Sequence, residues 1–223
     1  MRAVRPSPKA SCISPLDKRS ELYLAELIEW NKKFNLTSIT DPEEIRKKHF
    51  EDSLLLLQAI QLTNESVADV GAGAGFPGIP LKIACPGIKL TLIDSVKKKV
   101  EFMQHMIKTL DLKDAEAVWS RAEDFAAKNR ERFDLAVSRA VAKLNVLCEY
   151  CLPLIKVGGF FISYKEEKVE AEVEAAGKAI ETLGGKLKEI KKFPLRSLVI
   201  IEKAKLTPLK YPRRAGMAKK KPL

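Results

Sequence analysis

The residue types that could bind and act on a ligand concentrate in one short stretch, residues 67–80, which read VADVGAGAGFPGIP. The first four residues form an apolar run typical of a buried strand. The closely spaced glycines that follow favour a tight turn in which a ligand can contact the backbone, and Pro77 and Pro80 favour the start of a helix. This order of strand, glycine turn and helix predicts a pocket for a nucleotide-type ligand.

The glycines of this stretch fit two patterns. The dinucleotide-binding pattern G-x-G-x-x-G is met by Gly73, Gly75 and Gly78. The pattern D-x-G-x-G-x-G, typical of methyltransferases that use S-adenosylmethionine, is met by Asp69, Gly71, Gly73 and Gly75. Both kinds of site use an acidic residue roughly 20 residues further along to bind ribose hydroxyls, and Asp94 stands at that distance. Asp94 therefore fits either ligand.

Asp69 distinguishes between the two ligands. A carboxylate beside the loop would repel a pyrophosphate, but it would attract the ammonium and sulfonium groups of S-adenosylmethionine. We therefore expect a methyltransferase with S-adenosylmethionine as its cofactor. An NAD(P)-dependent oxidoreductase is the more distant alternative, and a noncatalytic RNA-binding factor on a methyltransferase scaffold is a third.

The composition predicts a basic protein with a substantial core. The chain has 223 residues, of which 46% are hydrophobic, enough for one α/β domain with an extension. Forty Lys and Arg against 29 Asp and Glu give a formal charge of +11, which favours a polyanion-binding surface over a merely solvated one. No stretch approaches the ~20 apolar residues of a membrane span, and the N-terminal residues lack the apolar core of a signal peptide. We expect a cytoplasmic protein without a membrane partner.

Cys148 and Cys151 form a C-x-x-C pair within a predicted helix. No second pair stands at zinc-binding spacing, and no strand precedes the pair as it does in thioredoxin. We expect both side chains to face the core and predict no metal site.

Two helices are expected before the glycine loop. The first spans about residues 16–33, and the second begins at Asp41 and Pro42, a strong helix start, and continues to about Ile60. His49 and Asp52 share a face of the second helix with Ser53. Such a trio is more often a local hydrogen-bond set than a catalytic one.

From residue 67 onward, predicted strands and helices alternate. Seven strands are expected, at residues 67–70, 90–93, 116–119, 133–137, 160–164, 186–191 and 198–202. The pattern predicts an open α/β sheet of the Rossmann-like, doubly wound kind. The last two strands are joined by a connection too short for a crossover, so the last strand is antiparallel. This mixed seven-stranded ending is usual in class I S-adenosylmethionine-dependent methyltransferases.

Ligands in such sheets bind beyond the carboxyl ends of the strands. Asp94 follows the second strand, residues 121–124 the third, Arg139 the fourth and Lys165 the fifth. Residues 121–124 would bind the cofactor's adenine, through a backbone N–H and an acidic side chain. Together with the glycine loop after the first strand, five loops therefore deliver polar groups to one rim.

The C-terminal tail concentrates positive charge and contains no acidic residue from Leu209 to the end. We expect a flexible arm that binds RNA phosphates. The residues expected to contact RNA there are Arg213, Arg214, Lys219, Lys220 and Lys221. The chain is thus divided into an N-terminal tail and helical extension (1–64), a Rossmann-like core (65–204) and a basic tail (205–223), together one structural domain.

Several motifs together resemble one family. They are DVGAGAGFPGIP at 69–80, LIDS at 92–95, SRAE at 120–123, SRA at 138–140, WNKKFNLT at 30–37, HFEDSL at 49–54 and YPRRAG at 211–216. Over nearly the whole chain the sequence resembles the RsmG (GidB) family of bacterial 16S ribosomal RNA methyltransferases. It departs from the family after Lys165, where a glycine often follows and this chain has Glu166.

The resemblance implies transfer of a methyl group from S-adenosylmethionine to N7 of one guanine in the decoding-centre loop of 16S rRNA. It implies that the small ribosomal subunit or its RNA is the partner. It places Asp94 on the ribose and assigns further cofactor contacts to Gly71, Phe76, Ala122, Glu123 and Arg139. A methyltransferase acting on tRNA or protein is the alternative if the family match is ignored.

Guanine N7 carries an exposed lone pair, so its methylation needs orientation rather than a strong base. The sequence agrees, because it has neither the N-P-P-Y type tetrapeptide of exocyclic-amine methyltransferases nor a Pro-Cys pair after the fourth strand. We expect Arg139 and Lys165 to lie nearest the target base or its phosphates, with His49 and Asp52 shaping the same mouth. A monomer is expected.

Overall fold

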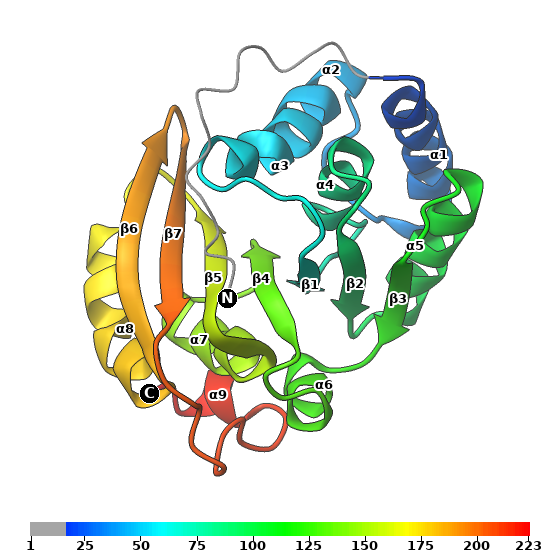
Figure 1. The fold of residues 1–223 in the computed structure, drawn as a ribbon. Helices are drawn as coiled ribbons and strands as arrows, with labels where there is room; N and C mark the ends of the chain where they lie inside the picture. Colours follow the sequence, from blue (N-terminus) through cyan, green and yellow to red (C-terminus); the bar gives the residue numbers. More distant parts are fainter. Residues whose placement is uncertain (1–16) are drawn as a thin grey trace.

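A computed structural model describes residues 17–223, and its centre is a seven-stranded sheet (Figure 1). The strands are β1 (Ser66–Val70), β2 (Lys89–Asp94), β3 (Ala115–Trp119), β4 (Phe133–Arg139), β5 (Ile155–Lys165), β6 (Gly185–Phe193) and β7 (Arg196–Lys203). Their order across the sheet is β3-β2-β1-β4-β5-β7-β6. From β1 the chain adds β2 and β3 on one side, and it then returns to add β4 and β5 on the other side, so the strand order reverses between the neighbours β1 and β4. Such a switch point is where α/β sheets bind ligands.

The last strand, β7, is antiparallel to both of its neighbours, β5 and β6. Residues 194–195 alone separate β6 from β7, which confirms the prediction from the short connection. β5 starts five residues earlier than expected, because its glycines at 158 and 159 interrupt the apolar pattern without ending the strand. The pairing of β4 with β5 shifts in register across this segment, since Phe133 pairs with Ile155 but Leu135 pairs with Phe160.

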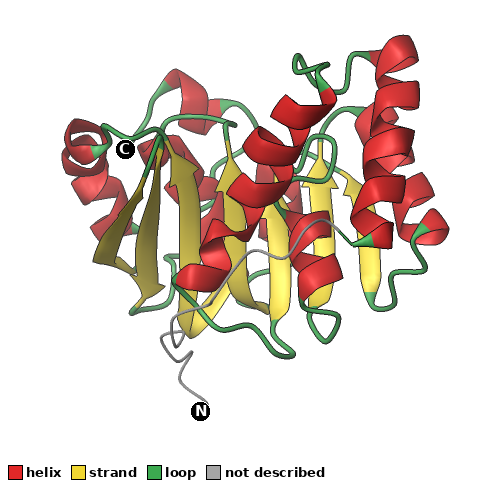
Figure 2. Cartoon of the chain, turned by 90° about the horizontal axis from the view of Figure 1, so that it is seen from above, coloured by secondary structure: helices red, strands yellow, loops and turns green. Residues whose placement is uncertain are grey.

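Helices cover both faces of the sheet (Figure 2). One face packs α1 (Lys18–Phe34), α4 (Gly78–Ala84) and α5 (Lys97–Thr109) into one core cluster. The other packs α6 (Ala122–Lys128), α7 (Leu144–Cys151) and α8 (Glu170–Thr182) into a second. Cys148 and Cys151 are free and fully buried in this second cluster, as predicted. No helix within residues 17–223 has the length and apolarity needed to cross a membrane.

The N-terminal helix α1 belongs to the same core as the glycine loop. Asp17 caps the helix by accepting a hydrogen bond from the Ser20 N–H at 2.9 Å. Tyr23 is fully buried, and its ring stacks on Phe76 at a centroid distance of 5.1 Å and packs edge-on against Phe50 at 5.1 Å. Its hydroxyl donates to the Ala74 carbonyl, so the extension holds the glycine loop directly.

The second helix starts as predicted but is not continuous. The Asp41 carboxylate accepts a hydrogen bond from the Glu44 N–H at 2.8 Å, which begins α2 (Pro42–Ile45). A π-helical turn (Arg46–Glu51), a short α3 (Asp52–Leu54) and a 3₁₀ turn (Leu55–Gln58) follow. The prediction of one regular helix to Ile60 is therefore wrong. The regular α-helical hydrogen bonding is interrupted where side chains donate to backbone carbonyls. The Ser53 hydroxyl and the Arg139 guanidinium both donate to the His49 carbonyl.

The basic tail is docked on the fold, so the expectation of a flexible arm is wrong. Tyr211 is 7% exposed and Ala218 1% exposed, and both belong to the core cluster that contains α7. The chain ends in a short helix, α9 (Met217–Lys220). Sequence composition could not reveal this docking, because the tail's partners, Glu149 among them, lie far away along the chain.

Gly177 offers a test of the helical assignment of α8. The residue is solvent-exposed in the middle of the helix, and an added Cβ would meet no atom within 4 Å. Gly177→Ala should stabilise the protein by about 0.5–1 kcal/mol, because alanine loses less backbone entropy in a helix. Thermal unfolding should show a rise of about 1–4 °C. A lowered midpoint would contradict the helical assignment at this position.

Candidate functional site

The glycine loop brings the chain's backbone close to the loop that follows β4. Gly71 follows β1 with a φ of +73°, and its N–H donates to the Ile93 carbonyl at 2.8 Å. A Cβ at this position would overlap the Val141 side chain. Glycine is therefore required here both for the left-handed backbone and for the close approach.

Asp69, at the end of β1, has a carboxylate that is fully buried. Its Oδ2 accepts a hydrogen bond at 2.8 Å from the N–H of Gly78, the first residue of α4, whereas its Oδ1 has no partner among residues 17–223. Burial raises the pKa of Asp69 to about 7, although the Gly78 N–H and the Arg139 charge oppose this. An unpartnered buried carboxylate oxygen suits a ligand that brings a positive charge, as the sequence argument expects.

Asp94 is fixed at the end of β2 by two backbone N–H groups. Gly73 donates to its Oδ2 at 2.9 Å and Val96 to its Oδ1 at 2.8 Å. Each oxygen keeps a free lone pair, and the residue is 8% exposed. The glycine loop and the acidic residue are thus joined directly, and the carboxylate can still accept hydrogen bonds from ribose hydroxyls.

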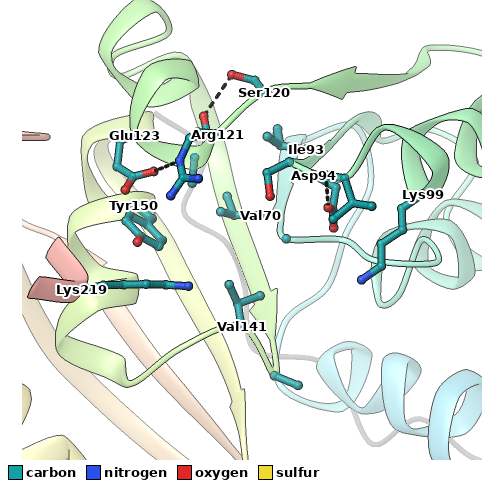
Figure 3. A pocket seen from close by; sticks show the side chains of 15 residues that line it. Val70, Ile93, Asp94, Lys99, Ser120, Arg121, Glu123, Val141, Tyr150 and Lys219 are labelled. Carbon is teal, nitrogen blue, oxygen red and sulfur yellow. Dashed lines mark hydrogen bonds and ion pairs between the residues drawn. The ribbon is translucent and has the colours of Figure 1, made fainter. Parts of the chain in front are cut away.

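A cleft of about 290 Å³ opens beside Asp94 (Figure 3). Ala122 and Glu123, at the start of α6, line it together with Gly71, so the cleft contains residues that the sequence analysis expects to contact the cofactor. Glu123 is 3% exposed, and Tyr150 stands next to it, with a pKa raised to about 12 by burial and then by the Glu123 charge. We call this the adenosine cleft.

A second hollow of about 360 Å³ lies along the glycine loop. It shares Gly71, Lys99 and Ala140 with the adenosine cleft, so the two adjoin. Its other described lining residues are Leu36, Thr37, Ile39, Lys48, His49, Ala72, Gly73, Ala74, Phe76, Arg139 and Arg196. We call it the Arg139 hollow. The glycine loop therefore borders two neighbouring hollows.

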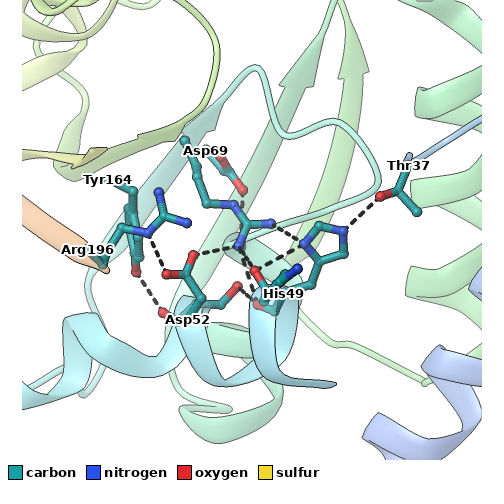
Figure 4. Close-up of polar contacts among 10 residues, drawn as sticks. Thr37, His49, Asp52, Asp69, Tyr164 and Arg196 are labelled. Carbon is teal, nitrogen blue, oxygen red and sulfur yellow. Dashed lines mark hydrogen bonds and ion pairs between the residues drawn. The ribbon is translucent and has the colours of Figure 1, made fainter. Parts of the chain in front are cut away.

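Arg139, His49 and Asp52 meet beside this hollow, as predicted (Figure 4). The Arg139 guanidinium donates to Asp52 Oδ2 at 2.9 Å and lies over the Phe76 ring at 5.3 Å. Arg196 holds the other oxygen of Asp52, with its Nε 2.6 Å from Oδ1. Asp52 is 9% exposed, so both of its oxygens are occupied in a buried cluster.

His49 is a neutral imidazole at pH 7. Burial, followed by the nearby Arg139 charge, lowers its pKa to about 4. Its Nε2 lies 2.8 Å from the Thr37 hydroxyl, which fixes the ring. His49 can therefore exchange hydrogen bonds, but it is a weak base.

Lys165 does not join this cluster. Its Nζ donates to the Ala142 carbonyl at 2.8 Å and to Glu172 Oε1 at 2.8 Å. The side chain is 12% exposed and lines a neighbouring hollow of about 670 Å³, which touches the Arg139 hollow at Ala140 and Arg196. The structure thus gives Lys165 an ion pair in place of a position beside Arg139.

The five basic tail residues expected to contact RNA are in different environments. Arg213 is bound to the buried Glu149, and Lys219 lines the adenosine cleft. The three whose side chains are exposed away from these contacts are Arg214, Lys220 and Lys221. The predicted single group is therefore split between the fold, the cleft and the surface.

Sequence reasoning missed Arg196 and Tyr150. The segment before Arg196 was interpreted only as a tight connection, yet a turn between β6 and β7 places its residues at the carboxyl end of β5, where the site lies. That topology was already predicted, so it could have identified Arg196. Tyr150 stands on an apolar helix face, and nothing in its spacing separates it from ordinary core residues.

Comparison with solved structures identifies the fold. The M. jannaschii TYW2 structure in complex with AdoMet matches with a TM-score of 0.57 and 18% identity over 74% of this chain and 77% of that one. A SAM-dependent methyltransferase from Aquifex aeolicus matches with a TM-score of 0.58 and 18% identity over 76% and 97%. The chain therefore has the S-adenosylmethionine-dependent methyltransferase fold that the sequence predicts.

Sequence comparisons identify the family. The model of the GidB family, described as rRNA small subunit methyltransferase G, matches residues 17–199. A ribosomal RNA small subunit methyltransferase G from Desulforamulus reducens is 51% identical over 91% of this chain and 88% of its own length. Its counterpart from Alkaliphilus metalliredigens is 50% identical over 90% and 88%. The family model and these relatives match almost the whole chain, including the glycine loop with Asp69 and Asp94. The chain therefore belongs to the rRNA small subunit methyltransferase G family.

Proposed function

We propose that the protein transfers a methyl group from S-adenosylmethionine to N7 of a single guanine in the decoding-centre loop of 16S rRNA. It would act as a monomer in the cytoplasm, on the small ribosomal subunit or its RNA. The observation that carries the choice of N7 is the absence of a usable base among the described residues that line the Arg139 hollow. They include no Asp or Glu, and their one histidine has a pKa of about 4.

Guanine N7 suits such a hollow because its lone pair is available without deprotonation. An exocyclic amine or a ring carbon would need a base or a nucleophile to prepare it. Asp52 supplies neither, since Arg139 and Arg196 occupy both of its oxygens. What the site provides is orientation, which can supply much of the rate enhancement.

The residues present fit S-adenosylmethionine. Asp94 would accept hydrogen bonds from the ribose hydroxyls, and the unpartnered oxygen of Asp69 would receive the cofactor's positive end. When bound, this cofactor supplies an electrophilic methyl group on a sulfonium. Arg139 can donate to guanine O6 or to a phosphate and so hold the base, and Asp52 partly offsets its charge as the base becomes positive.

The test is methyl transfer from labelled S-adenosylmethionine to small subunits and to free 16S rRNA that lack the modification, followed by mapping of the label. We expect the label at N7 of one guanine. Label on an exocyclic nitrogen, on another base or on tRNA would overturn the proposal while leaving the cofactor assignment intact.

The raised pKa of Asp69 predicts how cofactor binding depends on pH. The carboxylate must be ionised to attract the cofactor, and with a pKa of about 7 it is mostly protonated below pH 7. Affinity for S-adenosylhomocysteine, which carries the same ammonium group, should fall about tenfold per pH unit below 7 and level off above it. Calorimetry between pH 5.5 and 8.5 measures this.

Asp69→Asn is the control, because it removes the titrating group and should give weak binding with a flat profile. The ligand-free protein should show the opposite trend in stability. The folded-state pKa of Asp69 lies above the unfolded value of 3.8. The contribution of Asp69 to folding stability is therefore present below about pH 4 and is lost as the pH rises through 7. A wild-type affinity that does not change with pH would contradict the role given to Asp69.

A further inference from the structure

The last residues of the chain run beside α7 and α6, the helices that flank the adenosine cleft (Figure 1). Arg130, just after α6, donates to the Thr207 carbonyl at 2.5 Å and also to the Tyr211 carbonyl. Tyr211 and Ala218 are buried in the core cluster of α7. The segment from Tyr211 to Ala218 is therefore packed against the fold at both ends. We call residues 211–220 the C-terminal strap.

An ion pair fixes the middle of the strap. The Arg213 guanidinium donates to both oxygens of Glu149, with Nε 2.9 Å from Oε1 and Nη2 2.5 Å from Oε2. Its backbone N–H also donates to Oε1 at 2.8 Å. Glu149 is 1% exposed on α7, one residue before Tyr150 of the adenosine cleft. A carboxylate this deeply buried depends on its partner, so the strap and this part of α7 are held together.

The strap also reaches a cofactor-site residue directly. The Gly216 N–H donates to Glu123 Oε1 at 2.7 Å, and Glu123 lines the adenosine cleft. Gly216 has a φ of +84°, the left-handed conformation that turns this N–H toward the carboxylate as α9 begins. The other oxygen, Oε2, lies 3.9 Å from Arg121 Nε and would accept a hydrogen bond from the exocyclic amino group of adenine. The strap thus orients the carboxylate that the adenine would meet.

Lys219 extends from α9 into the cleft between Tyr150 and Val141 (Figure 3). It stands on the side of the cleft opposite Lys99, which comes from α5. One wall of the cleft is therefore made by residues near the end of the sequence. None of these contacts requires RNA.

We propose that the C-terminal strap is a wall of the cofactor site and that its docking and the binding of S-adenosylmethionine strengthen each other. The inference rests on the cofactor of the proposed function and not on the nucleotide that is methylated. Arg213 and Gly216 are positioning residues that act through Glu149 and Glu123, while Lys219 contacts the ligand. Coupling of this kind is reciprocal: whatever factor strap docking adds to cofactor affinity, the cofactor adds to docking.

Limited trypsin digestion of the wild-type chain tests the coupling without any substitution. The strap contains cleavage sites after Arg213, Arg214, Lys219 and Lys220. Saturating S-adenosylhomocysteine should slow cleavage at these sites at least fivefold, as followed by mass spectrometry. Cleavage after Lys205, outside the strap, is the internal reference. Equal slowing at both places, or none in the strap, would overturn the proposal.

Two variants test the residues. Arg213→Lys keeps a positive charge beside Glu149 but loses the two-point contact, and Lys219→Ala removes the side chain in the cleft. Each should raise the Kd for S-adenosylhomocysteine at least fivefold in calorimetry without RNA, whereas Lys205→Ala, the loss of an exposed charge next to the strap, should leave it within twofold. In methyl transfer, the KM for S-adenosylmethionine should rise and kcat should recover at saturation.

A Kd unchanged in both variants would overturn the proposal even if methyl transfer fell. Because both measurements omit RNA, discovery of a different methylated nucleotide would overturn the proposed function and leave this inference standing. A chain that binds no S-adenosylhomocysteine at all would overturn both.

Discussion

Gly71→Ala should abolish most cofactor binding. The new Cβ would overlap Val141 and would sit on a backbone with a φ of +73°. Left-handed strain costs about 1–2 kcal/mol, and displacement of the partly buried Val141 side chain adds about 1–3 kcal/mol. Since each 1.4 kcal/mol is tenfold in affinity, the Kd for S-adenosylhomocysteine should rise at least about thirtyfold in calorimetry.

Gly73→Ala is the matched comparison for this effect. Its φ is +61°, but the added Cβ would meet no atom of the described residues within 4 Å, so only the strain applies and the loss should be distinctly smaller. The double variant Gly71→Ala with Val141→Ala should regain part of the affinity, because it removes the overlap. Equal losses at the two glycines, with no recovery in the double variant, would show that Val141 does not matter. Thermal unfolding of each variant separates loss of binding from loss of fold.

Arg139→Ala should lower kcat/KM for methyl transfer about 100-fold or more. The guanidinium, 9% exposed, is the group at the hollow that contacts Asp52, the His49 carbonyl and the Phe76 ring together. Loss of one preorganised donor to the reacting substrate costs about 2.7–4 kcal/mol of transition-state stabilisation. Asp52 keeps Arg196 as a partner, so the fold should survive. Steady-state methyl transfer to small subunits measures the effect.

Arg139→Lys is the control for charge alone. A lysine retains the positive charge but cannot span Asp52 and the His49 carbonyl together, so its rate should stay well below that of the wild type. A second readout is the His49 titration by NMR: without the Arg139 charge, its pKa should rise from about 4. Wild-type methyl transfer and cofactor affinity in Arg139→Ala would remove Arg139 from the mechanism.

Local patterns were enough to predict the sheet and its rim. Apolar runs gave the strands, and the end of each run placed Asp69, Asp94 and Arg139 on one edge, where the structure has them. The glycine pattern has direct physical causes as well, since Gly71 and Gly78 would each meet a neighbouring side chain if they carried a Cβ. Such features depend on residues a few positions apart, or on strand order, and both can be inferred from a sequence.

What the sequence did not predict depends on contacts that form only in the packed fold. Glu172 stands only seven residues after Lys165, but it can bind this lysine only once α8 is packed against β5, and the spacing of the two residues does not reveal it. The tail was misjudged for the same reason. Its charge suggested a solvated arm, but one buried acid, Glu149, is enough to hold Arg213 against the fold. The π-helical turn likewise depends on a hydrogen bond from Arg139 to the carbonyl of His49, a residue 90 positions away along the chain.

The stacking of Tyr23 on Phe76 has a consequence for how the chain is made. During synthesis α1 leaves the ribosome before the rings that cover Tyr23, which belong to Phe50, Phe76 and Phe102. At typical rates of translation the helix must wait on the order of ten seconds for the last of them. The apolar stripe of α1 stays uncovered in that interval, so we expect this nascent segment to need shielding by chaperones.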